Sequence, residues 1–198
     1  MKFLDHICEQ NLRKDVNKMP LSFLEKNQPV DRIKWPDLML FLAYIVSSRS
    51  HDVQTQHGAI ICNQDNEIIA TGYNGFVRGI DDSILPNTRP NKYAIMIHAE
   101  ENSILNCARQ GKSTKGTTIY VTGMPCLHCL QCIWQAGIIK VIYGKQLSHM
   151  QKSEDAEEKS NMILSLTGLE IEHRIPNFST TSNMTDKTRQ ILKFFEKI

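Results

Sequence analysis

Two short motifs in this chain carry residue types suited to chemistry at a metal ion. The first is His98-Ala99-Glu100, and the second, starting 25 residues after the glutamate, is Pro125-Cys126-Leu127-His128-Cys129. One imidazole and two thiolates form a typical zinc ligand set, and three protein ligands leave the fourth tetrahedral position open to water, as in catalytic zinc sites. Because zinc lowers the pKa of bound water to roughly 7, the two motifs predict a site that generates a nucleophile at neutral pH.

Glu100 is expected to carry protons rather than to bind the metal. A carboxylate at this spacing from the imidazole is placed to act as a general acid and base. The arrangement H-x-E followed by P-C-x-x-C is the signature of zinc-dependent nucleobase deaminases, in which the glutamate is not a ligand. The pattern therefore predicts hydrolytic removal of an amino group, with His98, Cys126 and Cys129 as zinc ligands and Glu100 as the catalytic residue.

Two neighbouring residues leave an alternative arrangement of the metal open. Cys132 extends the second motif to C-x-x-C-x-x-C, and His128 lies between its first two cysteines. A closed site with Cys132 as fourth ligand is disfavoured, because six residues of helix span about 9 Å. We expect Cys132 to lie in the core, His128 on a helix surface, and Cys62 and Cys107 to be buried as small apolar side chains.

The composition predicts one soluble domain of intracellular type. The chain has 198 residues, a formal net charge of +2 and six cysteines, and cysteines in a reducing cytosol remain free or bind metal. No signal peptide pattern is visible, and the longest apolar run, 38–46, is far shorter than the roughly 20 residues that cross a bilayer. We therefore expect a cytoplasmic protein that does not bind a membrane. The small net charge does not call for a nucleic-acid partner.

Helices and strands are expected to alternate around the two motifs, which is typical of an α/β domain. Leu38, Phe41, Leu42 and Ile45 recur at helical spacing and predict the buried face of a helix that opens at Trp35. The later helices are expected at 100–109, at 125–136, after the charged stretch 153–159 with an end near Gly168, and at 188–198. The strands are expected within a hairpin over 58–73 and at 118–122, 138–143 and 169–173. Both motifs then lie where helices begin, and the partial positive charge there favours thiolates.

Two connections are expected to contact a ligand. Gly72-Tyr73-Asn74-Gly75 predicts a glycine-bounded turn that lets the backbone approach a bound molecule. Residues 78–96 predict a long polar loop, and loops of this length in compact domains are often lids or binding loops.

Beyond the two motifs, the chain resembles the deoxycytidylate (dCMP) deaminases of the cytidine deaminase superfamily from Trp35 to about Pro176. The shared segments are Arg49-Ser50-x-Asp52, Gly72-Tyr73-Asn74-Gly75 with Asp81-Asp82 after it, Lys92-Tyr93, Tyr120-Val121-Thr122 and Gln135-Ala136-Gly137-Ile138. The resemblance implies a three-layer α/β/α fold with a five-stranded mixed sheet. It also implies hydrolysis of dCMP to dUMP and ammonia, which supplies dUMP for thymidylate synthesis. We divide the chain into an N-terminal extension (1–34), the deaminase domain (35–176), and a linker with a C-terminal helix (177–198).

The same resemblance implies an assembly, effectors and further site residues. It implies a homohexamer that is activated by dCTP with Mg²⁺ and inhibited by dTTP. It implies that the backbone N–H of Ala99 and the side chain of Asn74 bind the substrate, and that Gly72, Tyr73, Gly75 and Lys92 belong to an effector or nucleotide loop. The substrate phosphate needs a cationic partner; we assign Arg49 to substrate binding, and the other candidates are Arg78, Arg89 and Lys92.

The chain departs from the family pattern at three places. Val77 stands where proline is usual, His57 replaces an apolar residue before Gly58, and Val53-Gln54 replaces Pro-Asn. These departures bear on the effector response more than on the chemistry. Some phage members carry a second zinc site in the loop before the His-Ala-Glu motif, but residues 76–97 contain neither cysteine nor histidine, so we expect one zinc ion per subunit.

Two other functions share the predicted zinc site. A deaminase acting on tRNA or single-stranded DNA would need a basic track with stacking aromatic side chains, whereas aromatic residues make up only 7% of this chain. A non-catalytic zinc module would have no use for Glu100. Deamination of a nucleotide is therefore the preferred interpretation.

Overall fold

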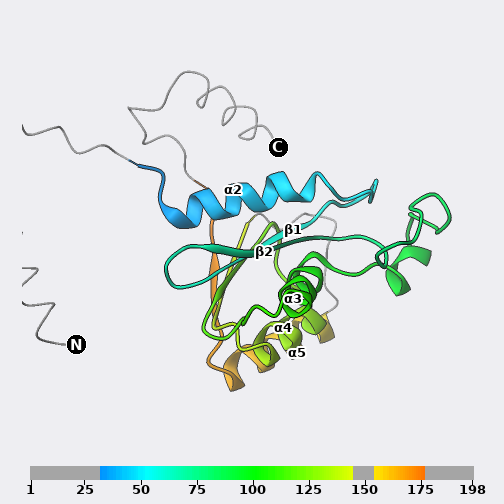
Figure 1. Cartoon of the computed structure of the whole chain (residues 1–198). Helices are drawn as coiled ribbons and strands as arrows, with labels where there is room; N and C mark the ends of the chain where they lie inside the picture. The colour runs from blue at the N-terminus through cyan, green and yellow to red at the C-terminus, as the bar shows by residue number, and fades with distance from the viewer. Residues whose placement is uncertain (1–31, 145–153, 177–198) are drawn as a thin grey trace, which may run out of the picture. The chain divides into compact units, whose positions relative to one another are not determined.

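The computed structural model of the protein describes residues 32–144 and 154–176 (Figure 1). From Ile33 onward these residues belong to one compact unit. The N-terminal extension predicted for 1–34 lies almost entirely outside the described residues, and the linker and helix predicted for 177–198 lie wholly outside them. No helix within the described ranges is long and apolar enough to cross a membrane.

Five strands form one mixed sheet in the order β2-β1-β3-β4-β5. β1 pairs in antiparallel fashion with β2 and β3, whereas the pairs β3–β4 and β4–β5 are parallel. The strands are β1 (Gly58–Cys62), β2 (Ile68–Tyr73), β3 (Thr118–Val121), β4 (Lys140–Tyr143) and β5 (Glu170–His173). All five residues of β1 are buried, as expected for an apolar strand covered on both faces. The predicted five-stranded mixed sheet is confirmed.

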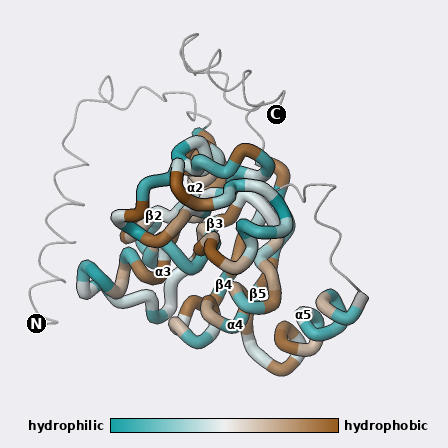
Figure 2. The backbone as a smooth tube through the Cα atoms, turned by 90° about the vertical axis from the view of Figure 1, so that its right-hand side faces the viewer, coloured by the Kyte–Doolittle hydropathy of each residue, from teal (hydrophilic) through white to brown (hydrophobic). Residues whose placement is uncertain are grey.

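Four α-helices cover the two faces of this sheet, which gives the predicted three layers (Figure 1). α2 (Trp35–Ser47) lies on one face; α3 (Ala99–Arg109), α4 (Leu127–Gln135) and α5 (Glu154–Leu166) lie on the other. Each interface has its own apolar core. The α2 side contains Met39, Ala43, Ile60, Tyr120 and Ile142. The opposite side contains Ile61, Ile119, Leu130, Ile133 and Val141. Figure 2 shows hydrophobic and hydrophilic residues alternating along these helices, as helices with one face on a sheet require.

The buried face predicted for α2 was wrong in part. Phe41 is buried, but Ile45 is 39% exposed, and the helix contacts the sheet chiefly through Met39 and Ala43. The cause lies in β1, because a side chain at Gly58 would meet the carbonyl oxygen of Ala43. The missing side chain lets the helix backbone rest on the strand at this point, and this contact turns α2 away from the face that its apolar spacing favours.

The glycine-bounded segment after the hairpin is strand rather than turn. Gly72 and Tyr73 belong to β2, and Gly75 forms an antiparallel bridge with Ile97. The long connection that follows is a loop, as predicted, with a short 3₁₀-helix, η2 (Asn91–Ala94), near its end.

Candidate active site

Both metal-binding motifs begin helices, as the sequence predicted. His98 is the N-cap of α3 and Cys126 is the N-cap of α4, each with extended backbone dihedral angles. The backbone N–H of Cys129 donates to Cys126 Sγ over 3.5 Å, so the sulfur caps the first turn of α4. The positive ends of the two helix dipoles therefore meet at one place, which favours thiolates there.

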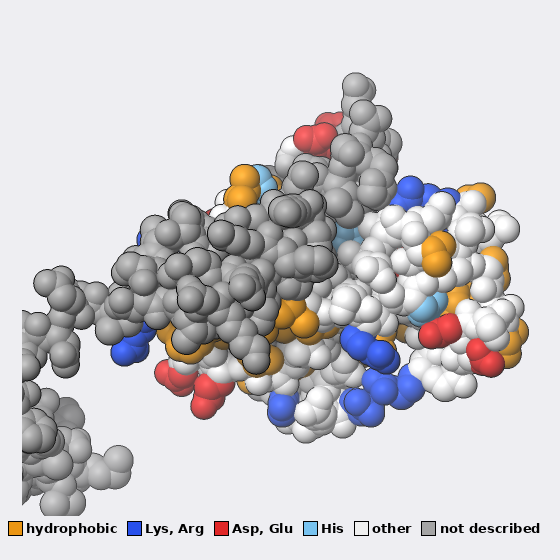
Figure 3. All heavy atoms as spheres, turned by 90° about the horizontal axis from the view of Figure 1, so that it is seen from above, with side chains coloured by type: hydrophobic (Ala, Val, Ile, Leu, Met, Phe, Trp, Pro, Cys, Tyr) orange, Lys and Arg blue, Asp and Glu red, His pale blue; other side chains and the backbone are white. Residues whose placement is uncertain are grey.

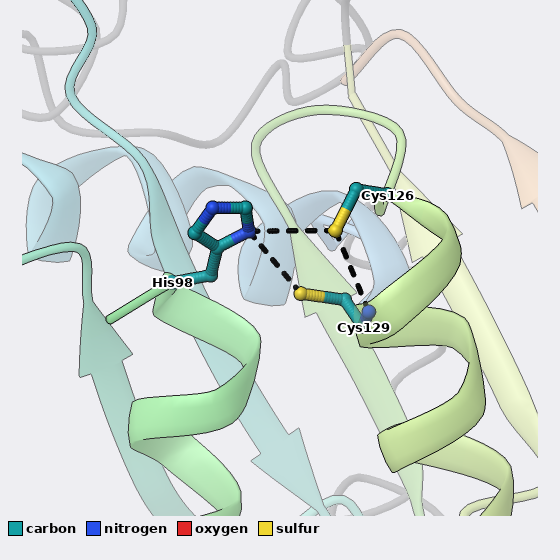
Figure 4. A group of neighbouring side chains, drawn as sticks. All are labelled: His98, Cys126 and Cys129. Atoms are coloured by element: carbon teal, nitrogen blue, oxygen red, sulfur yellow. Dashed lines mark hydrogen bonds between the residues drawn. The ribbon is translucent and has the colours of Figure 1, made fainter. Parts of the chain in front are cut away.

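The three predicted ligands converge on one point (Figure 4). His98 Nδ1 lies 3.5 Å from Cys126 Sγ and 3.3 Å from Cys129 Sγ, and all three ligand atoms lie within 4.8 Å of one another. Zinc–sulfur and zinc–nitrogen bonds of about 2.3 and 2.0 Å at tetrahedral angles place nitrogen and sulfur ligands about 3.5 Å apart. The donor set and its spacing fit zinc, with Nδ1 as the histidine ligand.

Cys132 does not join this group. The only group of potential metal ligands among the described residues consists of His98, Cys126 and Cys129. Cys132 Sγ instead lies 3.6 Å from Nε2 of His128; His128 is exposed, and Cys132 is half-buried outside the core. The prediction of a surface position for His128 is confirmed and that of a core position for Cys132 is wrong. Cys62 and Cys107 are buried as predicted.

The protonation of these ligands is already coupled within the protein. A hydrogen bond with Cys126 raises the pKa of His98 to about 9, although burial acts in the opposite direction. Hydrogen bonding from Cys129 and, after the opposing effect of burial, from His98 lowers the pKa of Cys126 to about 3. The hydrogen bond to Cys126 and burial raise the pKa of Cys129. These shifts favour a thiolate at Cys126, and a zinc ion bound here would displace the protons that the other two ligands hold.

Glu100 lies beside the ligands and is almost completely shielded from water. It is the second residue of α3, and the residue is 6% exposed. Burial raises its pKa, while the charge of His98 acts in the opposite direction. A carboxyl group whose pKa is moved toward neutrality can both accept and return a proton, as general acid–base catalysis requires. The site thus combines a group of metal-type ligands with a buried carboxyl group beside it.

The match to a family model decides the class of this site. Residues 34–145 match the model described as the cytidine and deoxycytidylate deaminase zinc-binding region. The chain belongs to this family. Its site is therefore that of a zinc-dependent hydrolase, and His98, Cys126 and Cys129 are the residues that the geometry offers to the metal.

Named relatives of this deaminase chain cover most of its length. The deoxycytidylate deaminase of Homo sapiens is 33% identical over 155 residues, which cover 75% of this chain and 84% of the relative. A probable deoxycytidylate deaminase of Drosophila melanogaster is 32% identical over 185 residues, covering 88% and 87%. Among solved structures, dCMP deaminase from the cyanophage S-TIM5 in complex with dCMP and dUMP has a TM-score of 0.56 and 26% identity, and the match covers 70% of this chain and 95% of the phage protein.

The residues expected to bind the substrate differ in their exposure to solvent. Ala99 is fully buried at the start of α3. Asn74 is 5% exposed, its Oδ1 accepts from the N–H of His57 over 2.7 Å, and its Nδ2 donates to Asp52 and to the carbonyl of Thr55. Arg49 is exposed. The amide of Asn74 is therefore occupied within the protein, and its contact with a sugar stays a prediction.

The four residues assigned to an effector or nucleotide loop occupy three different settings. Gly72 lies under α3, where a side chain would meet the backbone of Ala99 and Ser103. Tyr73 is 36% exposed at the end of β2, and Gly75 forms an isolated bridge with Ile97, the residue before His98. Lys92 is 3% exposed, and its Nζ lies 2.6 Å from each carboxylate oxygen of Asp52. Gly72 thus lies in β2 against the first turns of α3, and the role of these four residues in nucleotide binding stays a prediction.

The other two cationic candidates also have partners within the protein. Arg78 Nη2 donates to Asn106 Oδ1 over 3.1 Å, and Arg89 Nη2 donates to Thr55 Oγ1 over 2.6 Å.

Two polar contacts at this edge of the sheet were not predicted from the sequence. One is the buried Asp52–Lys92 pair. The other links His57 Nδ1 to Thr122 Oγ1 over 3.0 Å, and the same hydroxyl accepts from the N–H of Gly58 over 3.2 Å. Asp52, Lys92 and Thr122 occur in the segments that carry the family resemblance, but spacing alone gave no signal that these side chains meet.

Proposed function

We propose that this protein hydrolyses dCMP to dUMP and ammonia. The observation that carries the proposal is the convergence of three zinc-type ligands on one point beside the buried carboxyl group of Glu100. Support for dCMP in particular comes from relatives that are named deoxycytidylate deaminases and from the phage enzyme that binds dCMP and dUMP. A purely structural zinc site would not need Glu100.

Glu100 performs the proton transfers in the proposed reaction. Held by His98, Cys126 and Cys129, zinc would supply a water molecule whose pKa is lowered to roughly 7. Glu100 accepts the proton of that water and delivers it to N3 of cytosine as oxygen adds at C4. Glu100 then takes the remaining proton from the C4 hydroxyl and transfers it to the amino group, so that the C4 carbonyl forms as the C4–N bond breaks and ammonia leaves. The buried setting keeps bulk water from competing for these protons.

The substrate is held by backbone and cationic groups around this centre. The first N–H groups of a helix have no partner within it, so the N–H of Ala99 at the start of α3 is available for the pyrimidine carbonyl oxygen. Asn74 contacts the sugar, and Arg49, which is exposed, receives the phosphate. A planar guanidinium is suited to this task because it binds phosphate through two parallel hydrogen bonds.

The proposal includes the cellular role and the regulation that the family resemblance implies. The product dUMP supplies thymidylate synthesis in the cytoplasm. The enzyme assembles as a homohexamer, dCTP with Mg²⁺ activates it, and dTTP inhibits it. Val77 and His57 stand at departures from the family pattern, so the effector response is where this enzyme is most expected to differ from its relatives.

A substrate panel tests the proposal directly. Ammonia release is measured with dCMP, CMP, dCTP, deoxycytidine and cytosine, each with and without dCTP and Mg²⁺ as effector. We expect the highest kcat/KM for dCMP, with stimulation by the effector. Absence of turnover of every cytosine nucleotide by zinc-loaded protein would overturn the proposal.

A single-stranded oligonucleotide belongs in the same panel. Where the described residues are visible in Figure 3, their Lys and Arg side chains lie in separate groups. The formal net charge of +2 is also small. Affinity for a polynucleotide depends on many cations that replace its counterions, so we expect no deamination of the oligonucleotide. Faster deamination of the oligonucleotide than of dCMP would favour the polynucleotide-editing function instead.

A further inference from the structure

The loop between β2 and α3 is fastened to a second loop by a buried ion pair. The long loop, residues 76–96, is closed at its base by the bridge between Gly75 and Ile97. Near its end, Lys92 of η2 places Nζ 2.6 Å from both oxygens of Asp52, which lies in the connection between α2 and β1. The Lys92 and Asp52 side chains are 4% and 3% exposed. The ion pair therefore joins two segments that are 40 residues apart.

Asp52 also accepts hydrogen bonds from its own loop and from Asn74. Its Oδ1 accepts from the N–H groups of Gln54 and Thr55 over 2.8 and 3.0 Å, and its Oδ2 accepts from Asn74 Nδ2 over 3.1 Å. The two loops share further hydrogen bonds, from Asn87 Nδ2 to His51 O, from Arg89 N to Gln54 Oε1, and from Arg89 Nη2 to Thr55 Oγ1. Both carboxylate oxygens are thus engaged at the centre of one polar network.

Asn74 connects this network to the zinc ligands. Its backbone N–H donates to the carbonyl oxygen of His57 over 3.2 Å, and its Oδ1 accepts from the N–H of His57 over 2.7 Å. The next residue, Gly75, pairs with Ile97, which directly precedes the ligand His98. Asn74 is therefore linked to the ligand His98 through Gly75 and Ile97.

A buried ion pair is a poor means of increasing stability but an effective means of fixing geometry. The cost of desolvating both charges offsets most of their attraction, so apolar residues of similar size often stabilise a protein as well or better. Apolar residues, however, cannot accept hydrogen bonds, whereas Asp52 accepts them from four donors that lie in three segments of the chain. The Lys92 ammonium is also already committed to Asp52, which leaves it poorly placed to bind a phosphate.

We propose that Lys92 is a positioning residue for nucleotide binding. Through Asp52 it holds Asn74 and the two loops in the arrangement that receives the sugar and phosphate, and it does not itself contact the phosphate. This inference rests on the proposed function, since dCMP is the nucleotide. The wild-type measurement separates the two: wild-type protein that fails to deaminate dCMP contradicts the function, whereas the variants below test the positioning role.

The test compares Lys92→Met with Lys140→Met in zinc-loaded, full-length protein. Lys140 also lies in an ion-paired setting, 3.1 Å from Glu172, but it stands at the start of β4, at the opposite end of the strands from Thr122 and Cys126. We expect Lys92→Met to raise KM for dCMP by about tenfold with kcat changed by less than about threefold, the pattern for lost binding in ground and transition states alike. Lys140→Met is expected to leave both constants within about twofold of wild type.

Affinity for the product provides a readout that does not depend on turnover. Calorimetric titration with dUMP should show a Kd raised by about the same tenfold factor in Lys92→Met, with zinc still bound at about one ion per chain. Asp52→Asn, which removes the opposite charge and places an N–H₂ group among the donors around Asn74, should show the same effect. KM does not depend on the amount of folded enzyme, so partial unfolding of a variant does not imitate this result.

Three outcomes would overturn the positioning role. One is a wild-type KM and dUMP affinity in Lys92→Met, even if the variant melts at a lower temperature, because that result assigns Lys92 to stability alone. Another is a fall in kcat at unchanged KM. The third concerns the double variant Lys92→Met/Asp52→Asn, which removes both buried charges: return of its KM to the wild-type value would show that an unpaired charge, rather than lost positioning, caused the defect. If Lys92→Met yields no folded protein, Asp52→Asn and the double variant decide the question by the same measurements.

Discussion

Two neighbouring regions of the molecule are held by different kinds of interaction. We call them the metal edge of the sheet, which carries His98 and Cys126, and the paired loops, which meet at Asp52 and Lys92. His98 and Cys126 cap helices that pack on the sheet through apolar side chains such as Leu130 and Ile133. The loops around Asp52 and Lys92 are held instead by buried charges and hydrogen bonds. Sites built on helices and strands are held more rigidly than sites on loops. In the proposed function, the first region carries the chemistry and the second binds the nucleotide.

Loss of a metal ligand should have the largest effect. In Cys126→Ser we expect zinc content to fall from about one ion per chain to near zero, with no measurable deamination, because three protein ligands define the site. Cys132→Ser is the matched control, since Cys132 stands outside the ligand group. Metal analysis and ammonia release check both variants. Loss of zinc from Cys132→Ser would show that the fourth position is closed by this cysteine and that the site is structural.

Replacement of the proton carrier should leave the metal in place. Glu100→Gln is expected to lower kcat by about 10²- to 10⁴-fold, because the amide cannot shuttle protons. Zinc content should stay at the wild-type value, and dUMP should still bind. Full activity of the variant would remove Glu100 from the mechanism. The matched control is Glu101→Gln, which changes the next carboxylate of α3, whose side chain is 35% exposed beside His128.

The sequence predicted the metal edge far better than the paired loops, for a physical reason. Ligand type, spacing and helix starts are local properties, so His98, Glu100 and Cys126 could be assigned before their contacts were known. The meeting of Lys92 with Asp52 depends on how two loops without regular periodicity fold against each other. Long-range contact also explains the error in α2, because Gly58 of a later strand decides which helix face is buried.

Neutralising Asp52 should destabilise the loops in a pH-dependent manner. At pH 7, Asp52→Asn leaves the buried Lys92 without its counter-charge, which typically costs about 3–5 kcal/mol of unfolding free energy. Burial raises the pKa of Asp52, but the hydrogen bonds from Lys92, Gln54 and Thr55 outweigh it and hold the pKa below 3.8. A depressed carboxyl pKa stabilises the folded state above the unfolded value, and this stabilisation is lost as pH falls through the folded value.

The free energy of unfolding of Asp52→Asn should therefore lie furthest below that of wild type at pH 7. The difference between the two proteins should become smaller as the pH falls below 3.8. Urea unfolding at several pH values measures it. Asp155→Asn is the control, because the Asp155–Lys159 pair is exposed on α5 and contributes little. An equal difference at pH 7 and pH 3 would contradict the role of the Asp52 charge.

The smallest expected effect is a difference in unfolding free energy between alanine substitutions at Gly72 and Gly75. A Cβ at Gly72 would lie 2.2 Å from the carbonyl oxygen of Ala99 and 2.5 Å from the N–H nitrogen of Ser103, whereas at Gly75 the nearest atom, on the side chain of Tyr73, would be 3.5 Å away. Forcing an extra methyl group into a packed contact typically costs about 1–3 kcal/mol, and backbone atoms cannot rotate away as a side chain can. Gly72→Ala should therefore lower the unfolding free energy by this amount, whereas Gly75→Ala should change it by less than about 1 kcal/mol.

Because α3 carries both His98 and Glu100, the strain in Gly72→Ala should also reach the metal edge. A displacement of about 1 Å can cost a hundredfold in rate, so kcat should fall in Gly72→Ala while KM changes less. This pattern is the reverse of the one expected for Lys92→Met, which raises KM and spares kcat. If both variants changed KM and kcat in the same way, the metal edge and the paired loops would not have separate roles. The assignment of chemistry to one region and of nucleotide binding to the other would then be wrong.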